Sequence, residues 1–160
     1  MRKFLLTTSW DDGAEKDLKL AEVLQKYNIP ATFYIPIKDS ERRVLDRGKI
    51  REIGKEFEIG GHSYSHVDLT KLSEGCLREE IIKGKNELEE IIGRRVVTFA
   101  YPFGAYNLLT KQEVEFAGFD FARTTHSFGS SIGDKFVASP TVHAYKHSPL
   151  SFLNPRTTGW

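Results

Sequence analysis

The sequence lacks several features that would place it in a special class of protein. Cys76 is its only cysteine, so no internal disulfide can form, and the helical pattern around it favours a partly buried packing position. The 23 basic residues nearly balance the 22 acidic ones, which gives no electrostatic footprint for nucleic acid or an anionic membrane. No apolar run is long enough for a membrane span or a signal-peptide core, which predicts a cytoplasmic protein unless a leader has been removed.

What is present is typical of an ordinary globular protein. Hydrophobic residues make up 39% of the chain and charged residues 28%. A length of 160 residues suits one domain with a hydrophobic core. We therefore expect a single domain over 1–160, with an irregular C-terminal tail over 140–160 where the sequence shows no regular pattern.

Strand-like and helix-like segments alternate along the chain. The apolar run Phe4–Leu6 predicts a buried first strand that ends at two adjacent carboxylates, and further strands are expected over 31–35, 57–59, 96–99 and 119–122. Helical periodicity predicts helices over 15–27, 48–56, 73–92 and 109–117, the third capped by Ser73 and ended by Gly93. Residues 38–47 are expected to form an exposed connection, 126–134 a loop and 136–139 a short strand. This alternation predicts an α/β fold with a parallel sheet covered by helices.

Two pairs of polar residues are expected where strands end. Asp11 and Asp12 follow the first strand, and His62 and His66 follow the third, after Gly60 and Gly61, which we expect to let the backbone turn. Two imidazoles four residues apart can face one point, and with one carboxylate they form a common catalytic zinc set that leaves a position open for water. Each pair alone has an ordinary explanation, because Asp pairs cap helices and surface histidines are frequent. Their combination at strand ends in one small domain favours a metal site, with the second Asp free to handle a proton.

These motifs resemble those of a known family. Trp10-Asp11-Asp12-Gly13 and His62-Ser63-Tyr64-Ser65-His66 are similar to the first two motifs of the polysaccharide deacetylase family, also called the NodB homology domain or carbohydrate esterase family 4. Phe99-Ala100-Tyr101-Pro102-Phe103-Gly104 is similar to its third motif, and the resemblance extends over residues 4 to 145. It implies a distorted (β/α) barrel. Only five or six of the family's seven or eight units are countable here, so the barrel is expected to be short or incomplete at its C-terminal end.

The resemblance also implies a chemistry for these residues. Asp12, His62 and His66 would hold a divalent metal, with zinc the first choice and cobalt or nickel as alternatives. Asp11 would be the general base, and the backbone N–H at Phe103 would stabilise the oxyanion. The implied reaction is the removal of N-acetyl groups from an amino-sugar polymer or oligosaccharide by attack of a metal-bound water.

The third motif and its surroundings supply candidate substrate-binding residues. Aromatic faces near the metal would stack on sugar rings, and some of these side chains could equally belong to the core. The candidates are Tyr64, Tyr101, Pro102, Phe103, Gly104 and Tyr106. We call residues 62–66, which carry both histidines, the histidine loop. Ser63 is interpreted as a residue that braces this loop and not as a nucleophile, because no nucleophile-elbow sequence surrounds it.

The sequence departs from the family pattern at two places. Ala100 occupies the position where the family often carries an Arg that orients the base; Arg123 is a candidate to supply that charge, and a surface ion pair is the alternative. The family's terminal His, a general acid, has no counterpart, although His126, His143 and His147 remain candidates. Two alternatives to a sugar deacetylase therefore stay open, namely hydrolysis of a small non-sugar amide and a truncated carbohydrate-binding or vestigial protein with little turnover. The sequence does not indicate the oligomeric state.

Overall fold

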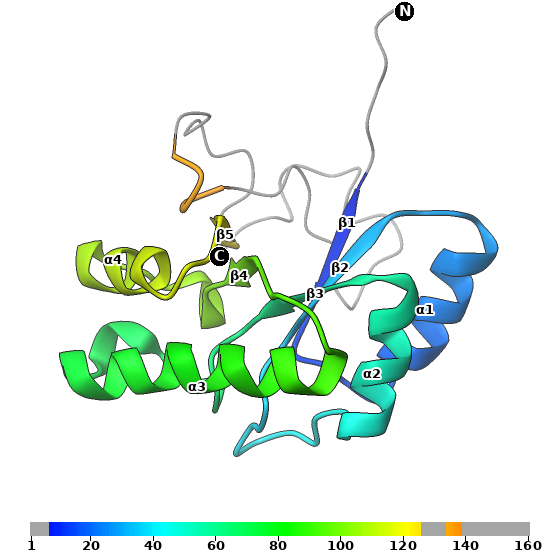
Figure 1. Ribbon diagram of the computed structural model, residues 1–160, viewed down its shortest axis with the longest axis horizontal. Coiled ribbons are helices and arrows are strands. Elements are labelled where there is room, and N and C mark those ends of the chain that lie inside the picture. Colours follow the sequence, from blue (N-terminus) through cyan, green and yellow to red (C-terminus); the bar gives the residue numbers. More distant parts are fainter. Residues whose placement is uncertain (1–6, 126–133, 139–160) are drawn as a thin grey trace, which may run out of the picture.

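The computed structural model describes residues 7–125 and 134–138 and contains a parallel sheet flanked by helices (Figure 1). The strands are β1 (Thr8–Asp11), β2 (Ala31–Ile35), β3 (Glu58–Gly61), β4 (Thr98–Ala100) and β5 (Phe121–Arg123). The helices are α1 (Asp17–Lys26), α2 (Arg47–Glu56), α3 (Glu74–Ile92) and α4 (Leu108–Phe116), with 3-10 turns η1 (Leu69–Lys71) and η2 (Pro102–Gly104). The α/β fold with a parallel sheet is confirmed.

The strand order is β1-β2-β3-β4-β5, so every strand pairs in parallel with the next one along the chain. A doubly wound sheet would reverse this order at a switch point, whereas a (β/α) barrel keeps it sequential. Each helix contacts the following helix, as expected when helices succeed one another around the outside of a curved sheet. The five strands therefore form an open part of a barrel.

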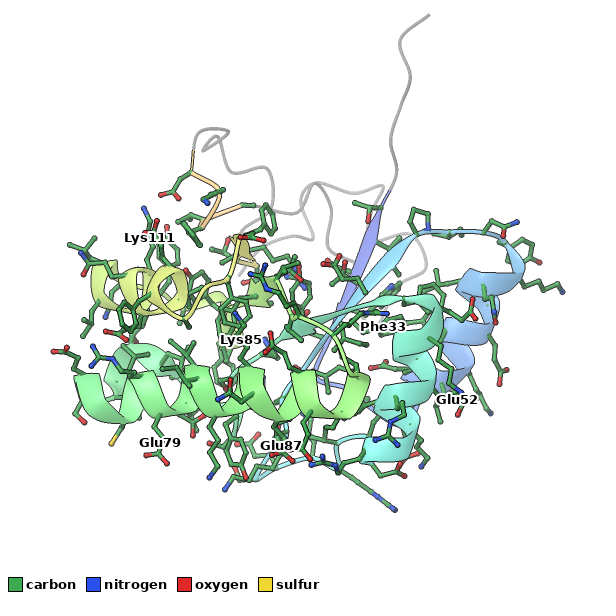
Figure 2. The ribbon with its side chains drawn as sticks, in the orientation of Figure 1. Phe33, Glu52, Glu79, Lys85, Glu87 and Lys111 are labelled. Atoms are coloured by element: carbon green, nitrogen blue, oxygen red, sulfur yellow. The ribbon has the colours of Figure 1, made fainter. Side chains whose placement is uncertain are left out.

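The core lies between the sheet and the helices. Alternate strand residues such as Phe33, Ile35, Ile59 and Phe99 are at most 1% exposed, and Figure 2 shows Phe33 on the helical side of β2. The helices meet them with apolar faces, and the buried side chains of strands and helices form one continuous core. The buried helical residues include Leu24, Ile50, Ile53, Leu77, Ile81, Leu88, Ile91 and Val114.

Most predicted boundaries are correct to within about two residues, and Gly93 ends α3 in the left-handed conformation with φ of 70°. Ser73 precedes α3 as predicted, but its side chain makes no capping hydrogen bond. The prediction of a first strand that ends at Asp11 is confirmed, but the burial predicted for it concerns its apolar run and is not tested. Thr8–Asp11 are partly exposed because β1 is an edge strand there, and Phe4–Leu6 lie outside the described residues.

Three other expectations need correction. Gly60 and Gly61 belong to β3 itself, and a Cβ on Gly60 would lie 2.4 Å from the Tyr34 ring, so close packing rather than a turn requires glycine there. Cys76 is exposed, because it lies on the outer face of α3. The connection between β2 and α2 is only partly exposed, since the side chain of Asp39 and Leu45 are buried.

The C-terminal expectations are mostly outside the described part of the chain. These include the tail over 140–160 and all of the predicted loop over 126–134 except residue 134. In place of the predicted strand over 136–139, Ala138 forms one isolated parallel bridge to Arg123. Among the residues described, no helix has both the length and the apolar character needed to cross a membrane.

Candidate metal centre and active site

The sequence-predicted site residues come together at one edge of the sheet. Asp11 ends β1, Asp12 follows it, His62 follows β3, and Arg123 ends β5. Because the strands are parallel, their carboxyl ends share an edge, which is where (β/α) barrels place their sites. The turn of η2 follows β4 at the same edge.

Asp12, His62 and His66 form a group of donors that fits a metal ion. Oδ1 of Asp12 lies 3.6 Å from Nε2 of His62 and 3.2 Å from Nε2 of His66, and the ligand atoms of the three residues lie within 4.8 Å of one another. Ligands about 2.0–2.1 Å from a tetrahedral zinc ion are separated by about 3.3 Å. The donor types therefore suit a divalent metal ion, and the two distances from Asp12 are close to the separation that such an ion requires.

The electrostatics of the group favour a cation. Hydrogen bonding to His62 and then to His66 holds the pKa of the Asp12 carboxyl far below its usual range, so this carboxylate is anionic. Hydrogen bonding to Asp12 in turn raises the pKa of His66. A metal cation held at this position would supply the positive partner of the Asp12 carboxylate.

The histidine loop is held from several sides. Nδ1 of His62, a residue only 2% exposed, lies 2.7 Å from the carbonyl oxygen of Ala100, which leaves Nε2 for the metal. The hydroxyl of Ser63 accepts a hydrogen bond of 3.0 Å from the N–H of His66, which confirms its predicted bracing role. Glu80 of α3 accepts from the N–H groups of Tyr64 and Ser65 at 3.1 and 2.8 Å. Nothing in the sequence around Glu80 distinguishes it from other helical glutamates, so this contact was not predicted.

Backbone strain is concentrated at this edge. Five non-glycine residues in the described part of the chain have positive φ, and four of them are Asp12, Ser63, His66 and Phe103. Their φ values lie between 52° and 75°, a region that costs energy for residues with a Cβ. Such strain persists where the surrounding structure fixes a functional geometry.

Arg123 forms an ion pair with Asp11, and its side chain is 8% exposed. The guanidinium also lies 4.6 Å from the centre of the Tyr34 ring. The alternative of a surface ion pair is therefore wrong. Arg123 is the register partner of Ala100 on the neighbouring strand, so an arginine reaches Asp11 although position 100 carries an alanine.

The predicted substrate-binding residues divide into exposed and buried groups. Phe103 is 62% exposed with its ring 4.8 Å from that of His66, and Tyr106 is 39% exposed. Tyr64 is partly buried, with its ring 5.2 Å from the ammonium of Lys38 and 4.2 Å from that of Lys83. Tyr101 is 1% exposed and donates its hydroxyl proton to the carbonyl of Phe136, so it belongs to the core.

Pro102 and Gly104 are also buried, and a Cβ on Gly104 would lie 2.1 Å from Oγ1 of Thr125. They shape the turn and do not present a face to a substrate. The candidate general acids His126, His143 and His147 lie outside the described residues.

Comparison with known proteins identifies relatives of the chain. The sequence profile of the polysaccharide deacetylase family matches residues 1–122. The uncharacterized protein YlxY of Bacillus subtilis is 35% identical over 106 residues, which cover 66% of this chain and 32% of YlxY. The peptidoglycan-N-acetylglucosamine deacetylase of Bacillus cereus is 28% identical over 104 residues, which cover 60% of this chain and 35% of that enzyme.

A solved structure shows the same fold. The Streptococcus pyogenes deacetylase PplD, in complex with acetate, superposes with a TM-score of 0.79 at 20% identity, covering 87% of this chain and 64% of PplD. The expected NodB-type fold, in a shortened form, is thereby confirmed. The chain spans about a third of the length of the two curated relatives. Since the family profile covers most of its residues, the chain belongs to the polysaccharide deacetylase family.

Proposed function

We propose that this protein is a metal-dependent hydrolase that removes N-acetyl groups from an amino-sugar polymer or oligosaccharide. The observation that carries the proposal is the convergence of Asp12, His62 and His66 within 4.8 Å at the edge where Asp11 ends its strand. Family membership supports the reaction class, because the named relatives include a peptidoglycan-N-acetylglucosamine deacetylase.

The metal would be held by the Asp12 carboxylate and by Nε2 of His62 and His66. When bound there, zinc supplies Lewis-acid chemistry, which lowers the pKa of a water molecule and polarises an amide carbonyl. Zinc is the first choice because two imidazoles and one carboxylate are a common set for it, and cobalt or nickel suit imidazole ligands as well.

Asp11 is proposed as the general base that takes a proton from the attacking water. Its side chain is 26% exposed, so it can reach a substrate, and the Arg123 guanidinium fixes one carboxylate oxygen. Within the described residues no ion pair or hydrogen bond engages the other oxygen, which can take the proton. Arg123 thus orients the base and balances its charge, the task that an arginine of the third motif performs in many family members.

Phe103 is proposed to act through its backbone. In the described part of the chain its N–H has no intramolecular partner, and its φ of 59° places it in a strained turn beside His66. An N–H aimed at the developing oxyanion typically contributes about 3 kcal/mol of transition-state stabilisation. The exposed rings of Phe103 and Tyr106 offer apolar faces on which a sugar ring can stack.

Specific observations keep a binding or vestigial protein as a second candidate. His62 and His66 are the only histidines in residues 7–125 and 134–138, so no further imidazole there can protonate the leaving amine. Loss of a general acid costs about 10²- to 10⁴-fold in rate. A protein with an intact metal group and little turnover would combine these features.

The test measures metal and product together. Protein purified with zinc is analysed for bound metal and for acetate release from N-acetylated chito-oligosaccharides. Asp11→Asn should keep the zinc and lose at least about 100-fold of the activity, because the amide cannot accept the proton. Asp120→Asn, at an exposed carboxylate beyond α4, should change neither quantity.

Two results decide against the proposal. Acetate release that survives Asp11→Asn would contradict the proposed base. Bound zinc with no acetate from this substrate or from small N-acetyl amides would favour the binding or vestigial protein. Release from small amides alone would move the substrate away from sugars.

A further inference from the structure

We propose that Asp39 and Arg42 are positioning residues that orient two of the three metal ligands, His66 and Asp12. Both lie on the connection between β2 and α2, which Figure 1 shows as the cyan segment leading into α2. The inference rests on the proposed function, because it concerns the geometry of the same metal site.

Asp39 fixes the ring of His66. Its side chain is 5% exposed, and its Oδ2 lies 2.8 Å from Nδ1 of His66. This close carboxylate favours a proton on Nδ1, and the lone pair of Nε2 is then left for the metal, on the side where Oδ1 of Asp12 lies 3.2 Å away. Asp39 therefore acts through His66 and is on the opposite side of the imidazole from the metal position.

Arg42 fixes one oxygen of Asp12. Its guanidinium forms an ion pair with Oδ2, whereas Oδ1 is the oxygen close to both imidazoles. The pairing leaves Asp12 one free oxygen for the metal, so this ligand binds through a single atom. One-atom binding preserves the open coordination position that a hydrolytic metal site needs.

Hydrogen bonds within the segment 39–42 link the two contacts. Oδ1 of Asp39 accepts hydrogen bonds from the N–H of Glu41 at 2.7 Å and from the N–H of Arg42 at 3.3 Å, so one carboxylate holds His66 and the backbone of Arg42 together. The start of the same segment is tied to the histidine loop, because the N–H groups of Ile37 and Lys38 both donate to the carbonyl of Tyr64 at 3.0 Å.

The third ligand is held separately, by the contact between His62 and the carbonyl of Ala100. Each of the three ligands thus has its second polar atom engaged by the protein. Two of these three contacts come from the single segment 39–42.

The first test is zinc affinity of the full chain, measured by competition with a chromophoric chelator at fixed pH. Asp39→Ala should weaken zinc binding about 10- to 100-fold, the usual cost of losing a partner of a ligating histidine. Asp39→Asn should weaken it less, because the amide oxygen still accepts from Nδ1. Glu41→Gln, on the same segment, should bind zinc like the wild type, because only its backbone N–H takes part.

The second test is the visible absorption of the cobalt-substituted protein, which reports coordination number and would not respond to a purely structural loop contact. In Arg42→Gln, Oδ2 of Asp12 becomes free to bind the same ion, so the absorption should weaken as the coordination number rises. Arg43→Gln is the matched control, because that side chain is 84% exposed and, among the described residues, its one ion pair is with Glu15, at 3.6 Å. Its cobalt spectrum should be that of the wild type.

The outcomes separate this inference from the proposed function. A wild-type chain that binds neither zinc nor cobalt overturns both. Tight wild-type binding with unchanged affinity in both Asp39 variants, or a cobalt spectrum unchanged in Arg42→Gln, overturns the positioning role and leaves the metal site standing. Circular dichroism checks folding, and if Asp39→Ala does not fold, the nearly isosteric Asp39→Asn decides.

Discussion

Asp17 provides the sharpest test of how the site affects stability. Its carboxyl group lies in the first turn of α1, is 8% exposed, and has one oxygen, Oδ2, without a hydrogen-bond partner. Burial raises the pKa of Asp17 to about 6, against the opposing hydrogen bond from Ala14, and the negative charges of Asp12 and Asp11 raise it further. A buried acid that is hard to ionise therefore lies close enough to Asp11 and Asp12 to feel their charges.

The consequence for stability follows from proton linkage. The ordinary pKa of this group is 3.8, so between about pH 4 and pH 6 the folded protein binds more protons at Asp17 than the unfolded chain does. The free energy of unfolding therefore falls as the pH rises through this window, and levels off above it. A shift of this size corresponds to about 3 kcal/mol for a nearly buried group.

Asp17→Asn removes the titration and keeps the shape of the side chain. We expect the variant to gain stability relative to the wild type as the pH rises, with the difference between the two proteins growing by about 2–3 kcal/mol from pH 4 to pH 7. The amide leaves a donor near the unsatisfied position, which costs about 1–3 kcal/mol at every pH, so the change with pH is the informative quantity.

The assay is urea unfolding at several pH values between 4 and 8, in chelator so that no cation alters the charge near Asp11 and Asp12. Glu22→Gln, at an exposed position of the same helix, is the control and should follow the wild type at every pH. A difference between Asp17→Asn and wild type that stays constant from pH 4 to pH 7 would refute the reasoning.

Two further predictions concern how α3 supports the histidine loop. Gly84→Ala should destabilise the protein by about 1–3 kcal/mol and weaken zinc binding, because a Cβ there would lie 2.8 Å from the backbone carbon of Ser63. In Gly75→Ala, where no atom lies within 4 Å, unfolding by urea should instead show a gain of up to about 1 kcal/mol; equal effects of the two changes would contradict the close packing. Glu80→Gln should cost about 1–3 kcal/mol and lower zinc affinity by loosening the loop, while Glu79→Gln, which points away from the body of the protein in Figure 2, should leave both unchanged.

The fold was largely predictable because its signals are local. Helical periodicity and the Gly93 stop depend on neighbours within a few residues, and the alternation of elements implies a parallel sheet. The grouping of Asp12 with the two histidines was predictable for the same reason, since these residues stand in short motifs at strand ends. Burial was less predictable along the first helix, where the apolar residues Val23 and Tyr27 are 51% and 63% exposed.

The contacts that hold the ligands were not predictable, because they join segments far apart in the chain. Asp39 stands in a charged stretch that resembles an ordinary surface connection, and only the folded chain brings it to His66. Glu80 likewise repeats the pattern of its exposed neighbours on α3. The burial of Tyr101 depends on Phe136, which lies 35 positions later. No local pattern carries such information.

Arg123 shows how a motif can be incomplete in sequence and complete in space. In the sequence, Ala100 stands where the family often carries an arginine, so the positive charge expected beside Asp11 is missing from this motif. Across the sheet, Ala100 and Arg123 are register partners on β4 and β5, so their side chains start from the same level and the same face. The methyl group of Ala100 occupies little of that face, and the Arg123 guanidinium reaches Asp11 over the ring of Tyr34. A second arginine at position 100 would place two positive charges beside one carboxylate. The alanine on β4 and the arginine on β5 together give Asp11 a single positive partner.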